Sequence, residues 1–277
     1  MTGRLNAGVL YVVATPIGHL GDLTRRAEEV LKKVQIVAAE DTRRTRVLLD
    51  HIDHRAPELL SLHEHNEHAV ADKLLARLQA GADVALVSDA GTPLVNDPGY
   101  LLVGAAHAAG IKTVPVPGAC SITTAISVCP LACQPFRYVG FLPAKSSARQ
   151  NALHQWLGAA DALVFLEAPH RILATLEDIG AITTRRVMLG RELTKKYETI
   201  LVGTAAEVAI ELGDNPRGEF TCIIEADKPR AVSYDQERVL SALLKELPPT
   251  QAAKIAASIC DVKKSEMYEL AVRLAAK

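Results

Sequence analysis

The chain has 277 residues, enough for two domains of ordinary size, and its 31 Lys and Arg against 32 Asp and Glu give a net charge of −1, which is no global sign of a nucleic-acid partner. Hydrophobic residues make up 49% of the chain but aromatic residues only 4%, which indicates an α/β protein with short strands of Ala, Val, Leu and Ile buried on both faces. The apolar runs are interrupted well before the roughly 18 residues that a membrane span needs, and the N-terminal run ends in Pro and Gly, so we expect neither a transmembrane helix nor a signal peptide.

The first half of the chain alternates short apolar strands with helical segments. The predicted strands are residues 9–14, 34–39, 59–62, 84–87 and 112–116, and the predicted helices are residues 25–33, a segment that begins at 40–42, and residues 66–80 and 99–109. Thr24 and the residues before it form a capping sequence for the first helix, and Glu40 and Asp41 favour the start of the second. This order predicts a parallel sheet with helices on its faces.

The pattern changes beyond Thr124, where several strands alternate or are separated by only a short loop. The predicted strands are residues 137–141, 162–167, 186–189, 199–202 and 219–225, and the predicted helices are residues 149–157, 170–179 and 205–212. A mixed sheet is therefore expected.

The last part of the chain is predicted to be a helical tail. Residues 227–229 read as a linker, residues 234–277 as helical, and Pro248 and Pro249 as a break before a helix capped by Thr250. We therefore expect an α/β domain over residues 1–120, a second α/β domain over residues 121–228 and a helical domain over residues 229–277.

Four loops rich in Gly and Pro follow predicted strands. They are "TPIG" (15–18), "SDAGTP" (88–93), "PGACS" (117–121) and "EAPH" (167–170). Ligands bind beyond the carboxyl ends of strands in open α/β sheets, and Gly lets the backbone approach a ligand closely. Any one of these loops could be an ordinary turn, but four of them favour a binding site. The chain has no G-x-x-x-x-G-K-[ST], and no G-x-G-x-x-G follows the first strand, so a nucleotide-like cofactor would bind in a less common way.

Eight segments stand in the order expected for one family. They are "YVVATPIGHLGDLTRRAEEVL", "AAEDTRRT", "SLHEHNE", "ALVSDAGTPLVNDPG", "VPGACSITTAIS", "FLPAKSSARQ", "FLEAPHRILATLEDI" and "GRELTKKYETI". In these segments the chain resembles the bacterial ribosomal small-subunit methyltransferase I family, over roughly residues 8 to 226. The tail resembles, more weakly, the small helical C-terminal domain of some members.

The resemblance implies a fold and an activity. The family belongs to the tetrapyrrole-methylase superfamily (class III methyltransferases), whose two α/β domains bind S-adenosylmethionine in the cleft between them, usually as a homodimer. The implied reaction is methylation of the ribose 2′-hydroxyl of a cytidine in 16S rRNA. The implied partner is 16S rRNA or the small ribosomal subunit. The implied location is the cytoplasm, with no membrane partner.

The same resemblance assigns cofactor contacts to the strand-end loops and to the strand over residues 162–167. The implied contacts are Pro16, Asp89, Ala90, Gly91, Thr92, Ser121, Ile122, Phe165 and Leu166. Among them, Asp89 is expected to hold the ribose or the methionine part of the cofactor.

The candidate catalytic residues are Lys195, Glu192 and Asp41. Methyl transfer to a hydroxyl requires in-line placement of the oxygen, and a base helps because a protonated hydroxyl is a poor nucleophile. Lys195 matches the family's Lys in "RELTK", and it could act as a base with a lowered pKa or, when charged, hold a phosphate. A surface ion-pair cluster is the alternative for this segment, and Glu40 is a further candidate base beside Asp41.

Five cationic residues become candidates for RNA phosphates if the substrate is RNA. They are Arg43, Arg44, Arg46, Lys145 and Arg149. Each alone is more often part of a solvated face, whereas phosphate contacts would make binding weaken with salt.

Two further patterns invite a metal interpretation that we do not favour. "HEHNEH" (63–68) lacks the H-E-x-x-H spacing, so it fits a surface helix start or contacts on the substrate side. Cys129 and Cys133 are four residues apart on an expected apolar helix, where packing is the better interpretation. The cysteines are five, an odd number in mostly apolar contexts, which indicates reduced thiols in a cytoplasmic protein.

Two alternatives to an rRNA methyltransferase stay open. One is a tetrapyrrole methyltransferase of the same fold, and the basic residues and the "HEHNE" and "RELTK" segments speak against it. The other is a catalytically silent RNA-binding or assembly factor, which would need no cofactor pocket. Binding of S-adenosylmethionine separates this last hypothesis from the two enzymes.

Overall fold

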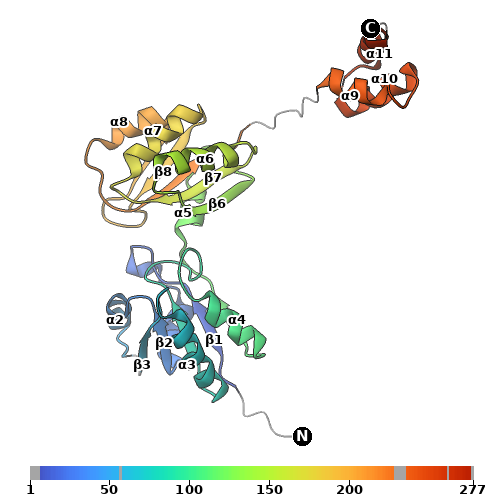
Figure 1. Ribbon diagram of the computed structural model, residues 1–277. Helices are drawn as coiled ribbons and strands as arrows, with labels where there is room; N and C mark the ends of the chain where they lie inside the picture. The colour runs from blue at the N-terminus through green and yellow to red at the C-terminus, as the bar shows by residue number, and fades with distance from the viewer. Residues whose placement is uncertain (1–6, 56–57, 228–234, 261, 276–277) are drawn as a thin grey trace, which may run out of the picture. The chain divides into compact units, whose positions relative to one another are not determined.

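The structure is a computed structural model that describes residues 7–55, 58–227, 235–260 and 262–275. Contacts between Cα atoms divide the chain into two compact units, Met1–Ala226 and Asp227–Lys277, here called the large unit and the small unit. The large unit contains two five-stranded sheets, and the small unit contains helices (Figure 1).

The first sheet of the large unit is entirely parallel, as predicted. Its strands are β1 (Leu10–Val13), β2 (Ile36–Ala39), β3 (Glu58–Ser61), β4 (Val84–Val87) and β5 (Thr113–Val116). They are arranged in the order β3-β2-β4-β1-β5. The carboxyl ends of β1, β2 and β4 therefore lie next to one another at one edge of the sheet.

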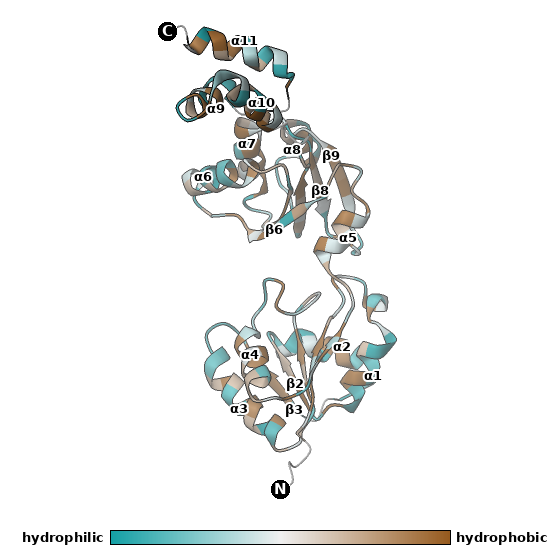
Figure 2. Ribbon diagram, turned by 90° about the vertical axis from the view of Figure 1, so that its right-hand side faces the viewer, coloured by the Kyte–Doolittle hydropathy of each residue, from teal (hydrophilic) through white to brown (hydrophobic). Residues whose placement is uncertain are grey.

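Helices cover both faces of this sheet (Figure 2). Their bounds are α1 (Arg25–Lys33), α2 (Thr42–His51), α3 (Glu67–Gln79) and α4 (Tyr100–Ala108), with a short 3-10 helix η1 (Leu20–Asp22). Successive strand residues point to opposite faces. In β2, Val37 and Ala39 pack with the helices α1 and α2, whereas Ile36 and Ala38 pack with α3 and α4. This two-sided burial explains why the strands are continuous apolar runs.

Helix α1 spans the predicted residues because both of its ends are encoded locally. The Thr24 side chain accepts a hydrogen bond from the N–H of Ala27, and Lys32 and Lys33 lie in the last turn, where the helix dipole favours cations. The N–H of Val34 still bonds to the carbonyl of Val30, so β2 begins at Ile36 and not at residue 34 as predicted.

The second sheet is mixed, as predicted. Its strands are β6 (Phe136–Phe141), β7 (Ala162–Glu167), β8 (Val187–Arg191), β9 (Thr199–Gly203) and β10 (Phe220–Ile224). The order is β6-β7-β10-β8-β9, and only β6 and β7 are parallel among these neighbours. The helices of this part of the chain are α5 (Ser121–Ser127), α6 (Ser146–Leu157), α7 (Ile172–Ile182) and α8 (Ala205–Leu212).

The two faces of the second sheet differ in what covers them. One face packs against α6, α7 and α8 around Phe165, Leu189 and Cys222. The other face, with Val164 and Met188, packs with α5 and with Ile17 from the loop after β1. A loop of the first sheet and the second sheet therefore share one core, and this shared core fixes the site described below.

Helix α5 ends earlier than the sequence suggested. Cys129 and Cys133 follow it in irregular chain, so the expected apolar helix that carries both is wrong. Both side chains nevertheless pack at the shared core, which agrees with a packing role. The early end is explained by Pro130, which has no N–H for a continuing helix.

The small unit contains α9 (Gln236–Leu243), α10 (Pro249–Cys260) and α11 (Lys264–Ala275). Small residues of α10, Ala252, Ala253 and Ala256, pack with Leu240 and Met267 in its core. Helix α10 begins at Pro249, so Thr250 lies inside its first turn and is not the preceding cap. In the described part of the chain, no helix is both long and apolar enough to cross a membrane.

Candidate active site

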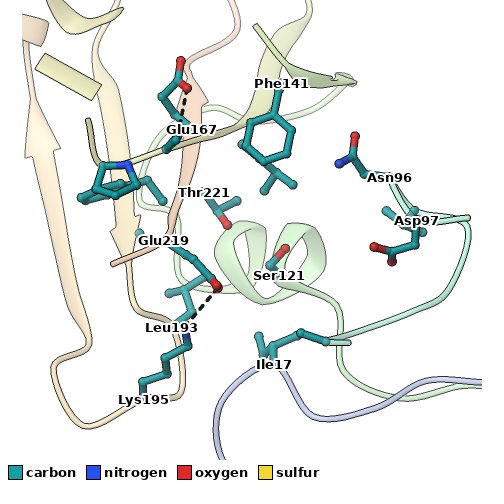
Figure 3. Close-up of a pocket in the computed structure, with 17 residues that line it drawn as sticks. Ile17, Asn96, Asp97, Ser121, Phe141, Glu167, Leu193, Lys195, Glu219 and Thr221 are labelled. Carbon is teal, nitrogen blue, oxygen red and sulfur yellow. Dashed lines mark hydrogen bonds and ion pairs between the residues drawn. The ribbon is translucent and has the colours of Figure 1, made fainter. Parts of the chain in front are cut away.

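A cavity of about 320 Å³ opens where the loops of the first sheet meet the second sheet in the large unit, and we call it the main cavity (Figure 3). This volume lies in the range of small-molecule sites. Its lining residues are Ile17, Ala90, Val95, Asn96, Asp97, Ser121, Phe141, Leu166, Glu167, Ala168, Pro169, Gly190, Leu193, Lys195, Glu219, Phe220 and Thr221.

The loop after β4 forms one side of the main cavity because neighbouring loops hold its backbone. Thr15 and Gly91 exchange two backbone hydrogen bonds of 2.8 and 3.0 Å, and the Thr92 hydroxyl donates to the carbonyl of Ala119. Leu94 and Asn96 adopt positive φ angles of 69° and 78°, which are costly for residues other than glycine. This fixed loop presents Asn96 and Asp97 to the cavity.

Asp97 has a strongly perturbed acidity. Burial of the carboxyl group, followed by the nearby charges of Glu40 and Asp89, raises the pKa of Asp97 to about 7. Glu40 is affected in the same way, since burial and the charge of Asp89 raise its pKa. Excess negative charge therefore collects at this end of the site, and a bound cation would relieve it.

Asp89 does not line the main cavity. Its Oδ1 accepts the backbone N–H of Asp41 at 2.8 Å, and its Oδ2 lies 3.6 Å from Nε of Arg44. The Asp89 side chain thus lies at a second cavity of about 200 Å³. That second cavity is lined by Thr15, Pro16, Ile17, Gly18, Leu20, Arg44, Thr45, Val47, Leu48, Ser88, Asp89, Ala90, Lys195 and Glu219.

Lys195 lies at both cavities and is held by two carboxylates. Its ammonium donates hydrogen bonds of 3.0 Å to Oε1 of Glu192 and to Oε2 of Glu219. Burial opposes the charge of this group, but the two carboxylates outweigh burial and raise the pKa of Lys195. The structure therefore argues against a lysine base with a lowered pKa and favours Lys195 as a cation held by two carboxylates.

Glu192 supports Lys195. It adopts a positive φ of 51°, and its Oε1 accepts the N–H of Glu219 at 2.9 Å as well as the Lys195 ammonium. Although burial disfavours the ionised carboxyl, these hydrogen bonds lower the pKa of Glu192. Glu192 is therefore an ionised anchor of the turn between β8 and β9.

Asp41 caps α2 by accepting the N–H of Arg43 and also forms a two-pronged ion pair with the Arg43 side chain. Hydrogen bonds from Arg43 lower the pKa of Asp41 to about 2. A carboxylate this acidic is a poor general base, so the structure argues against Asp41 in that role.

The predicted cofactor contacts are distributed over three places. Ala90, Ser121 and Leu166 line the main cavity, whereas Pro16, Asp89 and again Ala90 line the second. The remaining contacts fall on neither lining: Gly91, Thr92, Ile122 and Phe165. Phe165 needs a correction, because its fully buried side chain points to the helix-covered face of the second sheet.

Arg149 needs a second correction. Its side chain is only 3% exposed, and its guanidinium lies 2.6 Å from the buried carboxylate of Asp178 and donates to the carbonyl of Ala144. It is therefore a structural residue that cannot reach RNA. Lys145 is the exposed N-cap residue of α6.

The three arginines of α2 differ in whether they line a cavity. Arg44 lines the second cavity, but Arg43 and Arg46 line neither cavity. The Arg43 side chain is 87% exposed and engaged with Asp41.

The "HEHNEH" segment has a structural use. Glu67 begins α3, and its Oε1 accepts the N–H groups of Gly99 and Leu101 at 2.9 and 2.8 Å, at the start of α4. No group of three or more His, Cys, Asp or Glu side chains that could hold a metal ion is found among the residues that the structure describes.

Sequence reasoning missed several lining residues, above all Asp97, Phe141 and Glu219. Asp97 stands in the "NDPG" end of the loop after β4, so its position was a usable signal. Phe141 and Glu219 carry no local signal because only the pairing of β6, β7 and β10 brings them to the cavity.

The two sheets and the cavity at the strand ends agree with the match of residues 9–209 to the family described as Tetrapyrrole (Corrin/Porphyrin) Methylases. Residues 230–275 match the family described as RsmI C-terminal HTH domain. The chain is 47% identical to "Ribosomal RNA small subunit methyltransferase I" of Escherichia coli O157:H7, over 96% of this chain and 95% of the relative. It is 42% identical to the protein of that name from Pseudomonas aeruginosa, over 97% and 98%. The chain therefore belongs to the ribosomal RNA small subunit methyltransferase I family.

Solved structures agree on the fold. Diphthine synthase matches with a TM-score of 0.62 and 15% identity, over 79% of this chain and 90% of that one. Uroporphyrin-III C-methyl transferase from Thermus thermophilus, complexed with S-adenyl homocysteine, matches with a TM-score of 0.56 and 18% identity, over 79% and 98%.

Proposed function

We propose that the protein transfers a methyl group from S-adenosylmethionine to the ribose 2′-hydroxyl of a cytidine in 16S rRNA. The observation that carries the proposal is the 47% identity over 96% of the chain to a relative named as an rRNA small-subunit methyltransferase. The family resemblance, and not this identity, implies that the methylated nucleoside is cytidine and that the methylated atom is its 2′-oxygen.

The main cavity fits the cofactor. Ile17, Phe141, Leu166 and Leu193 offer apolar surface for an adenine ring. On the opposite side from Lys195, the Asp97 carboxyl faces the cavity and suits a sulfonium or ammonium group (Figure 3). This donor set favours a cationic ligand over a nucleotide triphosphate, for which the chain has no phosphate-binding loop.

When bound, S-adenosylmethionine would supply an activated sulfonium methyl for transfer to the hydroxyl oxygen, with the C–S bond broken as the C–O bond forms. The chain's residues must then place the hydroxyl in line and handle its proton. The Lys195 ammonium can donate a hydrogen bond to the oxygen as negative charge develops on it. The neighbouring Glu219 carboxylate, whose side chain is 72% exposed, can accept the proton and release it to water.

The test is methylation of small ribosomal subunits that lack the modification, with isotopically labelled S-adenosylmethionine. We expect one labelled 2′-O-methylcytidine per subunit after digestion to nucleosides and mass spectrometry. Naked 16S rRNA is the matched second substrate. Label found only on a base, or no transfer to either substrate by a protein that binds the cofactor, would contradict the proposal.

We also propose that the protein acts as a homodimer in the cytoplasm. The family resemblance supports this, and so do exposed apolar side chains on the two edge strands of the second sheet, Phe136 on β6 and Ile200 on β9. Unpaired strand edges are surfaces that a second copy can cover. Sedimentation equilibrium should give twice the chain mass, and a single-chain mass at micromolar concentration would contradict the dimer.

A further inference from the structure

The second cavity shares a wall with the main cavity. Ile17, Ala90, Lys195 and Glu219 line both. A group-transfer enzyme needs its donor and acceptor in contact, and in-line transfer allows only a short path between them. If the main cavity holds the methyl donor, as the proposed function requires, the acceptor belongs in the second cavity, next to these four shared residues.

The lining of the second cavity suits a nucleotide. Val47 and Leu20 are apolar side chains that are 61% and 37% exposed, so they offer accessible apolar surface for a base at this cavity. Arg44 and Lys195 provide the positive charges. The carboxylates of Asp89 and Glu219 neutralise these positive charges within the cavity. An anionic group of the ligand would therefore contact the solvent-facing side of Arg44.

Arg44 is free to make such a contact. Its Nε lies 3.6 Å from Asp89, and none of its other side-chain nitrogens bonds to a described residue. Its side chain is 63% exposed, so a phosphate can approach it. A guanidinium with free terminal nitrogens is the group best suited to form bidentate hydrogen bonds with a phosphate.

The lining of the second cavity singles out Arg44 among its neighbours. Arg44, Val47 and Leu48 have the i, i+3, i+4 spacing of a single helix face, and all of them line the second cavity. Arg43 also has the i, i+4 spacing to Val47, but its side chain is paired with Asp41, and neither Arg43 nor Arg46 lines a cavity. The three arginines of "EDTRRTR" are therefore not equivalent.

The shared wall is tightly built. A Cβ added at Gly18 would lie 2.5 Å from Cγ of Lys195 and 2.7 Å from Oγ1 of Thr194, so only glycine allows this approach. The N–H of His19 donates to the same Thr194 hydroxyl at 3.2 Å. The loop after β1 thus fixes the position of Lys195 against the second cavity.

We infer that the second cavity is the acceptor site for the target nucleotide, with a flanking phosphate on Arg44, the base against Val47 and Leu20, and the ribose hydroxyl at the shared wall beside Lys195. This inference rests on the proposed function, because it assigns the second cavity to that function's RNA substrate.

The experiment compares Arg44→Ala with Arg46→Ala, two equal changes of charge two residues apart on α2. Binding of a fluorescently labelled fragment of small-subunit rRNA is measured by anisotropy between 50 and 200 mM salt. For Arg44→Ala we expect about tenfold weaker binding and a salt slope reduced by about 0.7 to 0.9, the effect of one lost phosphate contact. For Arg46→Ala we expect a change of no more than about threefold.

Calorimetric titration with S-adenosylmethionine checks that the main cavity is intact. Arg44→Ala should bind the cofactor as the wild-type protein does, because Arg44 does not line the main cavity. Val47→Asp is the second variant, and we expect it to weaken RNA binding at every salt concentration by placing a charge against the base.

The outcomes separate this inference from the proposed function. Equal effects of Arg44→Ala and Arg46→Ala, or loss of cofactor binding in step with RNA binding, overturn the acceptor site even if methylation occurs. Selective RNA loss in Arg44→Ala supports the acceptor site, and it does so even if the wild-type protein methylates no 2′-hydroxyl, a result that overturns the proposed function alone.

Discussion

Asp97 is the residue at which the electrostatics of the main cavity are concentrated. Its carboxyl group is partly buried, lies near Glu40 and Asp89, and has a pKa of about 7. Ionisation of this carboxyl group is costly without a cation nearby and becomes favourable once a cation binds. Asp97 can therefore distinguish cationic S-adenosylmethionine from its neutral-sulfur product.

This arrangement predicts a pH-dependent cofactor affinity. Above pH 7 Asp97 is ionised and attracts the sulfonium, and as pH falls through 7 the carboxyl takes up a proton that cofactor binding must displace. Affinity for S-adenosylmethionine should fall by up to about tenfold from pH 8 to pH 6, the effect of one such proton.

Calorimetry at several pH values checks this prediction. Asp97→Asn should bind S-adenosylmethionine weakly and almost independently of pH, and S-adenosylhomocysteine should show a shallower dependence in both proteins. An unchanged pH profile in Asp97→Asn would assign the titration to another group, of which Glu40, with its raised pKa, is the first candidate.

Lys195 should affect the methyl-transfer step itself. Its ammonium is fixed between Glu192 and Glu219, and in the proposed acceptor site it would stabilise charge on the acceptor oxygen. Removing such a group costs on the order of a hundredfold in rate. Single-turnover methylation by Lys195→Ala should be slower by about that factor. Lys195→Arg, which keeps the charge, should recover part of the rate, whereas equal loss in both variants would show that shape and not charge matters.

At the scale of elements, α6 and α7 are joined by a buried network. Arg149 on α6 pairs with Asp178 on α7, and Asp178 also accepts hydrogen bonds from Ser146 and Gln150. The Arg149 guanidinium also donates to the carbonyl of Ala144 in the loop after β6. This network therefore holds the loop that follows Phe141 of the main cavity.

Arg149→Ala should lower the free energy of unfolding by about 3–5 kcal/mol, because it leaves the Asp178 carboxylate buried without its cation. Urea unfolding followed by the fluorescence of Trp156, which lies on α6 and is the only Trp in the chain, measures this loss. The double variant Arg149→Met with Asp178→Leu should recover much of it. A single variant as stable as the wild type would show that the pair is not needed.

Helices α1 and α6 show what sequence patterns can and cannot predict. The caps and periodicity of α1 were sufficient to place its ends at Arg25 and Lys33, because the interactions that end it are local. Arg149 was interpreted as an RNA contact because Asp178, its partner, lies 29 positions away and is brought close only by the packing of α6 on α7.

Strand faces limited the prediction in a second way. The two-residue period places Phe165 and Leu166 on opposite faces of β7, but the sequence does not say which face meets the cavity. Glu219 and Lys195 meet for the same reason, since the pairing of β8 with β10 brings their loops together. The strands and loops were thus predictable from the sequence, but the contacts between side chains on different strands and loops were not.

At the scale of the whole molecule, both cavities belong to the large unit. Every residue that lines either cavity lies between Thr15 and Thr221, inside Met1–Ala226. The small unit has its own core around Leu240 and Met267. Each unit therefore has the internal packing needed to fold separately.

A chain shortened to residues 1–226 should thus bind S-adenosylmethionine with an affinity within about twofold of the full chain, since no cavity contact is removed. Its affinity for small-subunit RNA should fall by at least about tenfold. The small unit matches a family described as an HTH domain, a motif that commonly contacts nucleic acid, and its Lys254, Lys263 and Lys264 are exposed.

Cofactor affinity and RNA affinity of the shortened chain test different roles of the small unit. Weaker cofactor binding by residues 1–226 would mean that the small unit contributes to the site, against the lining of both cavities. Unchanged RNA affinity would instead place all RNA recognition on the large unit, where Arg44 and Lys145 are exposed cations. Because Arg44→Ala can be combined with the truncation, additive losses in RNA affinity would show that the two units contact separate parts of the substrate.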